Sequence, residues 1–139
     1  MLQPRGLAVF HEYDFSIVHR SWPPAPLRDG TMALFDRLFA RACCSNMGTR
    51  LWSLLVEAGF ETPDCRAEYP IDGGSDSPYF EWFTESLRSV LPHAIALGIV
   101  TADEINIDTF EERLRAENIA AGSCFPAPAM IGAFARLKG

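Results

Sequence analysis

Three segments of this chain have the pattern of a β-strand, and that small number is the strongest limit on its fold. The first is the apolar run Leu7–Phe10, and the last is Ala129–Ala135, whose apolar composition predicts an interior strand buried on both faces. Between them, Cys65–Ile71 alternates apolar with polar residues and contains Pro70, which is typical of an edge strand with one wet face. We expect Leu7–Phe10 to be buried as well.

Helical periodicity occupies much of the remaining sequence. It is clearest over Met47–Ala58, where apolar residues recur at helical spacing and Gly59 supplies a left-handed position just past the end. A proline-rich loop is predicted between Ser21 and Gly30, with a helix following from Thr31. Further helices are predicted after Ser77, at the capping box Thr101–Glu104, and from Asp108 or Thr109 to Ala121. About four or five helices cannot all cover three strands on two closed faces, so the predicted architecture is an incomplete α/β fold.

Composition limits the classes of partner. The 139 residues suffice for one domain with a core of its own. A formal charge of −6 argues against nucleic acid and against an anionic membrane surface. Hydrophobic residues make up 48% of the chain, which predicts apolar surface that another chain covers.

Cysteine spacing and apolar run lengths bear on metals and on location. Cys43, Cys44, Cys65 and Cys124 have no metal-ligand spacing, so we expect free thiols in a reducing cytoplasm and no metal site. No apolar run approaches the ~18 residues of a membrane span, and the first apolar run is too short for a secretory signal. The expected location is therefore cytoplasmic.

Three segments together resemble the C-terminal half of class I S-adenosylmethionine-dependent methyltransferases: LAVFHEYD from residue 7, VEAGF from residue 56 and MIGAFARL from residue 130. That family has a Pro-Gly-Gly turn before its fifth strand, and this chain has Pro4-Arg5-Gly6. The resemblance implies that Leu7–Tyr13 is the fifth strand, Cys65–Ile71 the sixth and Ala129–Leu137 the seventh, with Met47–Ala58 as the helix after the fifth.

The resemblance also implies a fold class and a domain plan. The fold would be a partial Rossmann-like methyltransferase fold with a three-stranded mixed sheet in the order fifth, seventh, sixth strand, in which the seventh strand is antiparallel. Residues 1–139 would form a single domain, the substrate-side portion of such an enzyme. Helical insertions at about 15–45 and 75–122 would cover the substrate.

The chain departs from the family at the cofactor site. The family binds S-adenosylmethionine through its N-terminal half, where a glycine-rich loop lets the backbone approach the ligand closely. This chain has no such loop, because Gly73 and Gly74 follow the predicted edge strand and no Gly-x-Gly spacing occurs. S-adenosylmethionine is thus the cofactor that the resemblance implies, but we expect no binding to this chain alone and assign no cofactor-binding residues.

Candidate site residues gather at the end of the first strand. Ligands of open α/β sheets bind at the carboxyl ends of strands, which directs attention to His11, Glu12, Tyr13 and Asp14. His11 or Glu12 would act as a general base or orient a hydroxyl or amine of the methyl acceptor, and Tyr13 and Asp14 would contact it. The alternative is that Glu12 is merely solvated or ion-paired.

Aromatic residues supply a second set of candidates. Trp22, Tyr79 and Trp82, with Phe80 and Phe83, would line an acceptor pocket formed by the helical insertions. The competing interpretation is that these rings form core or a subunit contact.

Two functions from different classes follow. One is the acceptor-binding half of a small-molecule methyltransferase, inactive until a separate chain supplies the cofactor-binding half. The other is a non-catalytic binding or dimerisation module. An α/β-hydrolase fragment would need a Gly-x-Ser-x-Gly elbow, which the sequence lacks. The unpaired apolar strand predicts a homodimer, formed by pairing of residues 6–12 across a two-fold axis or by helices packed over the edge. The alternative is a separate chain that supplies the cofactor-binding half and completes the enzyme.

Overall fold

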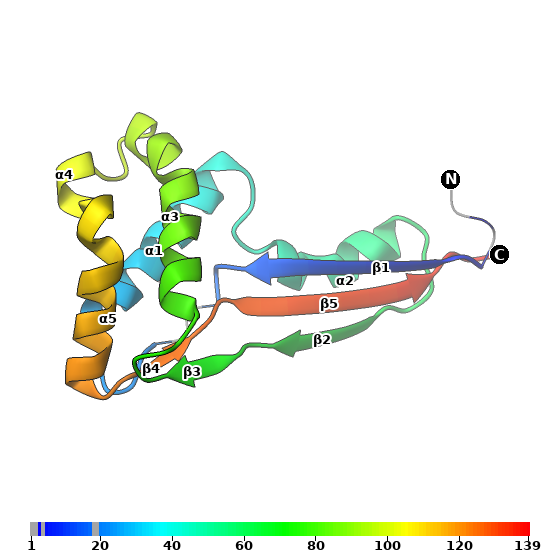
Figure 1. Cartoon of the computed structure of the whole chain (residues 1–139). Helices are drawn as coiled ribbons and strands as arrows, with labels where there is room; N and C mark the ends of the chain where they lie inside the picture. The colour runs from blue at the N-terminus through cyan, green and yellow to red at the C-terminus, as the bar shows by residue number, and fades with distance from the viewer. Residues whose placement is uncertain (1–2, 4, 18–19) are drawn as a thin grey trace.

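The computed structural model describes residues 3, 5–17 and 20–139 of the chain, which form a mixed α/β fold. In chain order the elements are β1 (Leu7–Asp14), α1 (Pro26–Ala42), α2 (Met47–Glu57), β2 (Asp64–Glu68), β3 (Ile71–Gly73), α3 (Tyr79–Ala96), α4 (Ala102–Ile105), the 3₁₀ turn η1 (Ile107–Thr109), α5 (Phe110–Ala121), β4 (Cys124–Pro126) and β5 (Ala129–Arg136). The helices α1, α3, α4 and α5 gather at one end, and the long strands β1 and β5 extend away from them with α2 alongside (Figure 1).

Two antiparallel sheets replace the single mixed sheet that the sequence predicts. The larger has the order β1-β5-β2, and β5 runs antiparallel to both neighbours, with Leu7 opposite Arg136 and Asp64 opposite Phe134. The smaller pairs β3 with β4. The predicted strand Cys65–Ile71 is wrong in its extent, because Tyr69 and Pro70 separate β2 from β3. An interior position for the last strand and an edge position for β2 agree with the sequence patterns.

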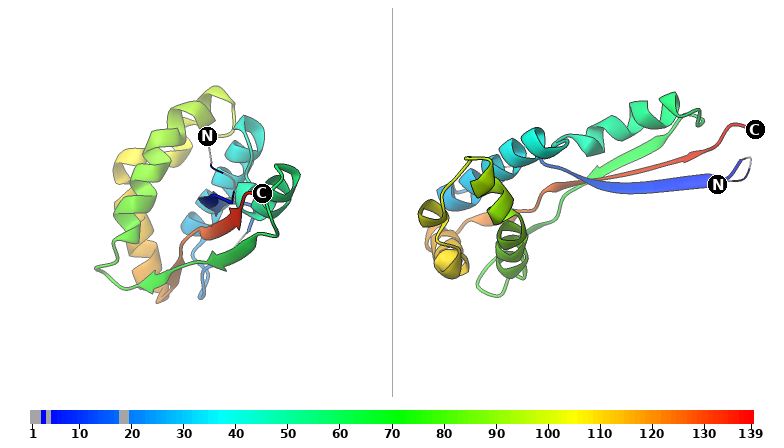
Figure 2. Two further views of the ribbon diagram at one scale, coloured as in Figure 1. Left: turned by 90° about the vertical axis from the view of Figure 1, so that its right-hand side faces the viewer. Right: turned by 90° about the horizontal axis from the view of Figure 1, so that it is seen from above.

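Burial of the apolar strands differs from the prediction. Leu7 is 48% exposed and Val9 is 68% exposed, so the expectation of a buried first strand is wrong. Along β5 burial alternates instead of covering both faces. The reason is that α2 covers one face of the three-stranded sheet, and the described residues place no helix over the other (Figure 2).

The sheet and α2 share a small core. Leu51 and Leu55 of α2 pack against Ile131, Ala133 and Ala135 of β5. The predicted end of this helix is confirmed, because Gly59 has a φ of 86°. The Phe60 amide then donates to the Leu55 carbonyl at 3.0 Å, which closes the last turn.

The helical end has a separate core. Its buried side chains come from α1, α3, α5 and β4: Met32, Leu34, Phe35, Leu38, Phe80, Phe83, Leu87, Ala94, Phe110, Leu114 and Phe125. The regions expected as helical insertions therefore pack on one another at one end of the sheet (Figure 2). The predicted capping box is confirmed, since Thr101 and Glu104 exchange both of its hydrogen bonds, and α5 ends at Gly122 as predicted.

Helix α1 begins five residues earlier than predicted. Pro26 occupies its first position, where the absence of an amide hydrogen costs nothing. The next amide, that of Leu27, donates to both carboxylate oxygens of Glu117 on α5, at 3.1 and 2.9 Å. A residue ninety positions away thus satisfies the helix start, which no local pattern reveals.

The turn before β1 places a non-glycine residue in the left-handed region. Pro4 lies outside the described residues, but the Gly6 amide donates to the Gln3 carbonyl at 2.8 Å and Arg5 has a φ of 62°. A type II turn has a positive φ at this third position, and a non-glycine residue there costs roughly 1 kcal/mol. None of the helices among the described residues has the length and apolarity to cross a membrane.

Candidate functional site

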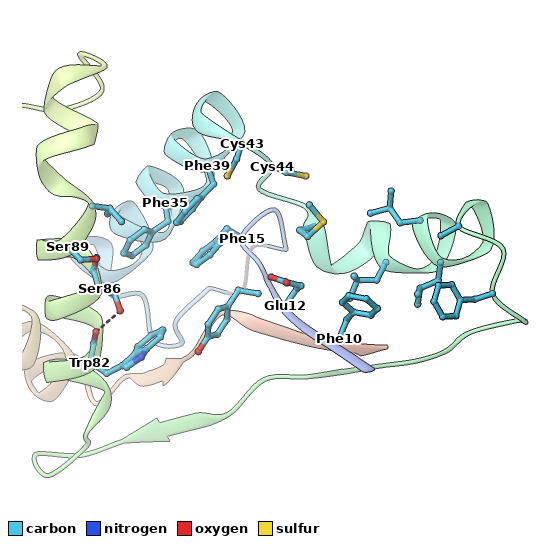
Figure 3. Close-up of a pocket in the computed structure, with 18 residues that line it drawn as sticks. Phe10, Glu12, Phe15, Phe35, Phe39, Cys43, Cys44, Trp82, Ser86 and Ser89 are labelled. Carbon is cyan, nitrogen blue, oxygen red and sulfur yellow. Dashed lines mark hydrogen bonds between the residues drawn. The ribbon is translucent and has the colours of Figure 1, made fainter. Parts of the chain in front are cut away.

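A groove of about 780 Å³ lies where the carboxyl end of β1 meets α1, α2 and α3 (Figure 3). The side chains of 18 residues line it, and most of them are apolar. They come from elements that the chain separates widely, so the groove forms only when the helical end packs against the end of the sheet. Its position beside the carboxyl end of β1 agrees with the location predicted for the site.

One wall of the groove is mainly aliphatic and belongs to the sheet end of the molecule. It consists of Phe10 from β1 and a stripe that runs along α2 and just past it: Met47, Leu51, Leu54, Leu55, Ala58 and Phe60. Leu51 and Leu55 lie deepest in this stripe, because they also pack against β5. The apolar stripe of α2 is wider than the part of it that contacts the sheet, and the remaining apolar side chains face the groove.

The other wall is aromatic. Phe15, which follows β1, stacks on Phe39 of α1 with ring centroids 4.6 Å apart and an angle of 19° between the planes. It also lies 5.5 Å from Phe35, centroid to centroid. Trp82 of α3 lies 6.0 Å from Tyr13, which completes a continuous aromatic surface. Offset and tilted arrangements at these separations are favourable for aromatic rings, and a planar ligand can add to them.

Polar groups in the groove are few. Glu12 supplies the one carboxylate among the lining residues, and Figure 3 shows it between Phe10 and Phe15. The hydroxyls of Ser86 and Ser89 donate to carbonyl oxygens of their own helix, at 2.8 Å each. Cys43 and Cys44 lie at the rim, and the Cys44 thiol donates to Asn46 Oδ1 at 3.0 Å. The groove therefore favours an apolar molecule that presents one positive or hydrogen-donating group to Glu12.

His11 and Glu12, predicted to act together, lie on opposite faces of the sheet. Neighbouring residues of a strand point to opposite sides, and Glu12 points to the face that α2 covers. His11 lies on the other face, where a Cβ on Gly132 would come 4.0 Å from its Cδ2. His11 does not line the groove, so the prediction that it contacts the acceptor is not supported by its position.

Asp14, predicted to bind substrate, is fully buried and holds the start of α2. Its carboxylate accepts hydrogen bonds from the Thr49 amide at 2.8 Å and from the Ser16 amide and hydroxyl at 3.1 and 2.5 Å. Burial raises the pKa of Asp14, but hydrogen bonds from Ser16 and Thr49 outweigh burial and leave it below its ordinary value of 3.8. Asp14 is therefore a structural carboxylate at a helix N-terminus.

Replacing Asp14 with asparagine is expected to cost about 1–3 kcal/mol of stability at neutral pH, because the buried donors lose a charged acceptor. A lowered pKa in the folded state means that this contribution is complete above the ordinary pKa and is lost as the pH falls through the lowered one. The stability difference between wild type and Asp14→Asn should therefore shrink on acidification. Urea unfolding at several pH values measures it, with Asp76→Asn as the control at an exposed carboxylate. A gap that stays constant with pH would contradict this role.

The aromatic candidates divide into two groups. Tyr79 lies 6.3 Å from Trp82 and stacks on Phe125 at 5.9 Å, so it supports the groove from behind. Tyr13 and Trp82 line the groove directly. Trp22 is 78% exposed and does not line the groove, so the structure does not bring it together with the other two.

Residues that the sequence analysis missed make up most of the lining. Phe10 belongs to the first predicted strand, and Phe15, Phe35 and Phe39 belong to the insertion expected to cover the substrate. The rings of these last three pack against one another. Their spacing on strand and helix is that of any buried stripe. A lining role could not be distinguished from a core role without knowing which elements meet.

The fit of a metal or of S-adenosylmethionine can be judged from the residues present. Among residues 3, 5–17 and 20–139, no cluster of three or more metal-ligating side chains occurs. Gly73 and Gly74 line a shallow hollow beside α5, but a Cβ on Gly74 would meet nothing within 4 Å and one on Gly73 only atoms beyond 3.4 Å. A Cβ at either position would clash with no protein atom, and no Gly-x-Gly loop of the kind that holds the family's cofactor occurs among the described residues.

No family model matches this chain, and no curated protein matches it.

Proposed function

We propose that this chain binds a small, largely apolar molecule in the groove between β1, α1, α2 and α3. The observation that supports this most directly is the lining itself, in which an aromatic wall and a mainly aliphatic wall face each other across about 780 Å³ with the carboxylate of Glu12 between them. Clefts of this size and composition, with few convergent polar groups, are typical of small-molecule sites.

We further propose that the groove is the acceptor side of a methyltransferase-like fold. Two features support this step: β5 lies antiparallel between β1 and β2, and the groove adjoins the carboxyl end of β1. Methyl transfer would require a cofactor-binding half from another chain. Without one, the same groove makes the chain a non-catalytic binding module.

Glu12 should select the charge of the ligand. Its carboxylate attracts an ammonium or a donor hydroxyl and repels an anion, and the surrounding apolar walls weaken screening by water. We therefore expect a preference for an aromatic amine over an aromatic acid of the same size. As a partly exposed pair, the contact should contribute about 1 kcal/mol, which corresponds to about fivefold in affinity.

Calorimetric titration with 1-naphthylmethylamine and 1-naphthylacetate tests this function. Wild type should bind the amine about fivefold more tightly, and Glu12→Gln should bind the two probes about equally. Glu81→Gln is the matched control, because Glu81 is an exposed carboxylate on α3 that does not line the groove. If neither probe binds wild type, or if Glu81→Gln also abolishes the preference, the proposed site is wrong.

S-adenosylhomocysteine separates the two parts of the proposal. The isolated chain should give no binding heat with this compound, because the sequence lacks the Gly-x-Gly loop with which the family holds the nucleoside. Tight binding would refute the assignment of an acceptor-side half while leaving the naphthyl result unaffected. Binding of the amine without binding of S-adenosylhomocysteine is the expected pair of results.

A further inference from the structure

We propose that strand β1 of one chain pairs antiparallel with β1 of a second copy, across a two-fold axis that passes near Val9. The inference goes beyond ligand binding and depends on a different surface, the free edge of the three-stranded sheet. Its outcome is a sheet that continues from one copy into the other. Four observations lead to it, concerning backbone groups, exposed side chains, register and charge.

The backbone of β1 presents unused hydrogen-bonding groups along one side. The Leu137 amide donates to the Gly6 carbonyl at 2.9 Å, which shows that Gly6 faces β5. In an antiparallel ladder alternate residues direct both backbone groups to the same neighbour, so the even-numbered residues of β1 face β5. Leu7, Val9 and His11 then direct theirs outward, to the side where the described part of the chain places no strand. Such an edge is a template for another strand.

The side chains of the same segment are apolar and accessible. Val9 is 68% exposed and Leu7 is 48% exposed on the sheet face that lacks a helix, beside Phe134, which is 40% exposed. Phe10 points to the opposite face and is also exposed in part. An unpaired strand with large apolar side chains exposed on both faces is what soluble proteins avoid, unless another chain covers it.

Geometry restricts the register. A two-fold axis perpendicular to the sheet keeps each face continuous, so Val9 must meet an odd-numbered residue of the second copy. The Tyr13 end of β1 is occupied by α3, because Tyr13 contacts Trp82. An axis at Val9 places the pairing on the accessible end, with Leu7 opposite His11 of the second copy. Each of these pairs would exchange two backbone hydrogen bonds.

Charge favours a second copy as the occupant. From residue 7 to residue 11 the strand has no Asp, Glu, Lys or Arg side chain. Two such segments meet without like charges opposite one another, despite the formal charge of −6 on each chain. Moving the axis toward Glu12 would bring the two carboxylates together, which is destabilising. The axis near Val9 avoids this.

The pairing would also extend the groove. Ala8 and Phe10 share a face with Glu12, the face on which the groove opens. With the axis at Val9, Phe10 of the second copy lies opposite Ala8, next to Phe10 of the first. The second copy thereby adds an aromatic side chain beside the β1 wall, and a dimer carries two grooves on one face of a continuous sheet.

Sedimentation equilibrium of the full chain in the micromolar range tests the proposal. Wild type should sediment at twice the 15.4 kDa mass of the chain, and Val9→Lys should sediment as the monomer. Ile71→Lys is the matched control, because Ile71 is 60% exposed on β3 and lies outside the proposed interface. It should remain dimeric. A monomeric wild type, or a Val9→Lys protein that stays dimeric, overturns the proposal.

A cross-linking variant reports on the register and does not depend on how Val9→Lys folds. Val9→Cys, with Cys43 and Cys44 changed to serine, should form an intermolecular disulfide on mild oxidation. Residues directly opposite in a hydrogen-bonded antiparallel pair have Cα atoms about 5.5 Å apart, within disulfide range. Ile71→Cys in the same background should stay reduced. Absence of the Val9→Cys dimer band, or an equal band for Ile71→Cys, would show that the strands do not pair at this position.

Discussion

Replacing Arg28 with methionine is expected to lower the free energy of unfolding by about 3 kcal/mol. The guanidinium is fully buried, donates to the Pro126 carbonyl of β4 and to Asp29 at 3.1 Å, and lies 5.5 Å above the Phe125 ring. Methionine fills a similar volume but donates nothing. A buried carbonyl would lose its charged donor, and Asp29 would lose its counterion.

The control for this prediction is Arg88→Met. The Arg88 side chain is 45% exposed and pairs with Glu85 and Asp108 on the surface, where such contacts contribute little. Its substitution should change stability by less than about 0.5 kcal/mol. Urea unfolding of the two variants beside wild type measures both. Equal losses of unfolding free energy in the two variants would contradict the prediction, because the buried contacts of Arg28 would then stabilise the fold no more than the surface contacts of Arg88.

Replacing Gly48 with alanine is expected to cost about 2 kcal/mol, although alanine is the better helix former. A Cβ at this position in α2 would lie 2.4 Å from Ile131 Cγ1, 2.9 Å from Ile131 Cβ and 3.1 Å from Asp14 Cβ. Helix and strand would have to separate. The movement would also displace Leu51, so affinity for the naphthyl amine should fall with stability.

Gly30→Ala is expected to raise stability, whereas Gly48→Ala should lower it, although both glycines lie within helices. Gly30 lies inside α1, and a Cβ there would meet nothing within 4 Å. Only the helix propensity changes, so this variant should be more stable by about 0.5–1 kcal/mol. Thermal unfolding of both glycine variants separates the two effects. A stabilised Gly48→Ala protein would show that α2 does not pack on β5 as closely as described.

The sequence predicted helix ends correctly where a residue within the helix's own segment stops the helix. Gly59 ends α2 and Gly122 ends α5 as expected, because a left-handed residue is required there whatever the surroundings. Prediction failed at the start of α1. Proline and glycine suggested a loop, but the carboxylate of Glu117 satisfies the Leu27 amide and extends the helix.

The candidate site was only partly predictable. Glu12, Tyr13 and Trp82 do lie in the groove, since strand ends and exposed aromatic residues are general indicators. His11 and Asp14 do not, because the same four-residue cluster divides between two sheet faces and a buried helix start. Residues that are adjacent in the sequence lie at the same place in the fold, but their side chains point in different directions.

The amino-acid sequence by itself determined where most helices end, roughly where the three strands of the larger sheet lie, and that β5 belongs in the interior of that sheet with an edge strand at β2. These depend on backbone sterics and on apolar periodicity, which act over a few residues. Only the tertiary structure decided which apolar side chains are buried. An apolar run has the same pattern whether a helix covers it, as over β5, or leaves it exposed, as at Val9. That difference depends on contacts between elements far apart in the chain, and both the groove and the free edge of β1 arise from it.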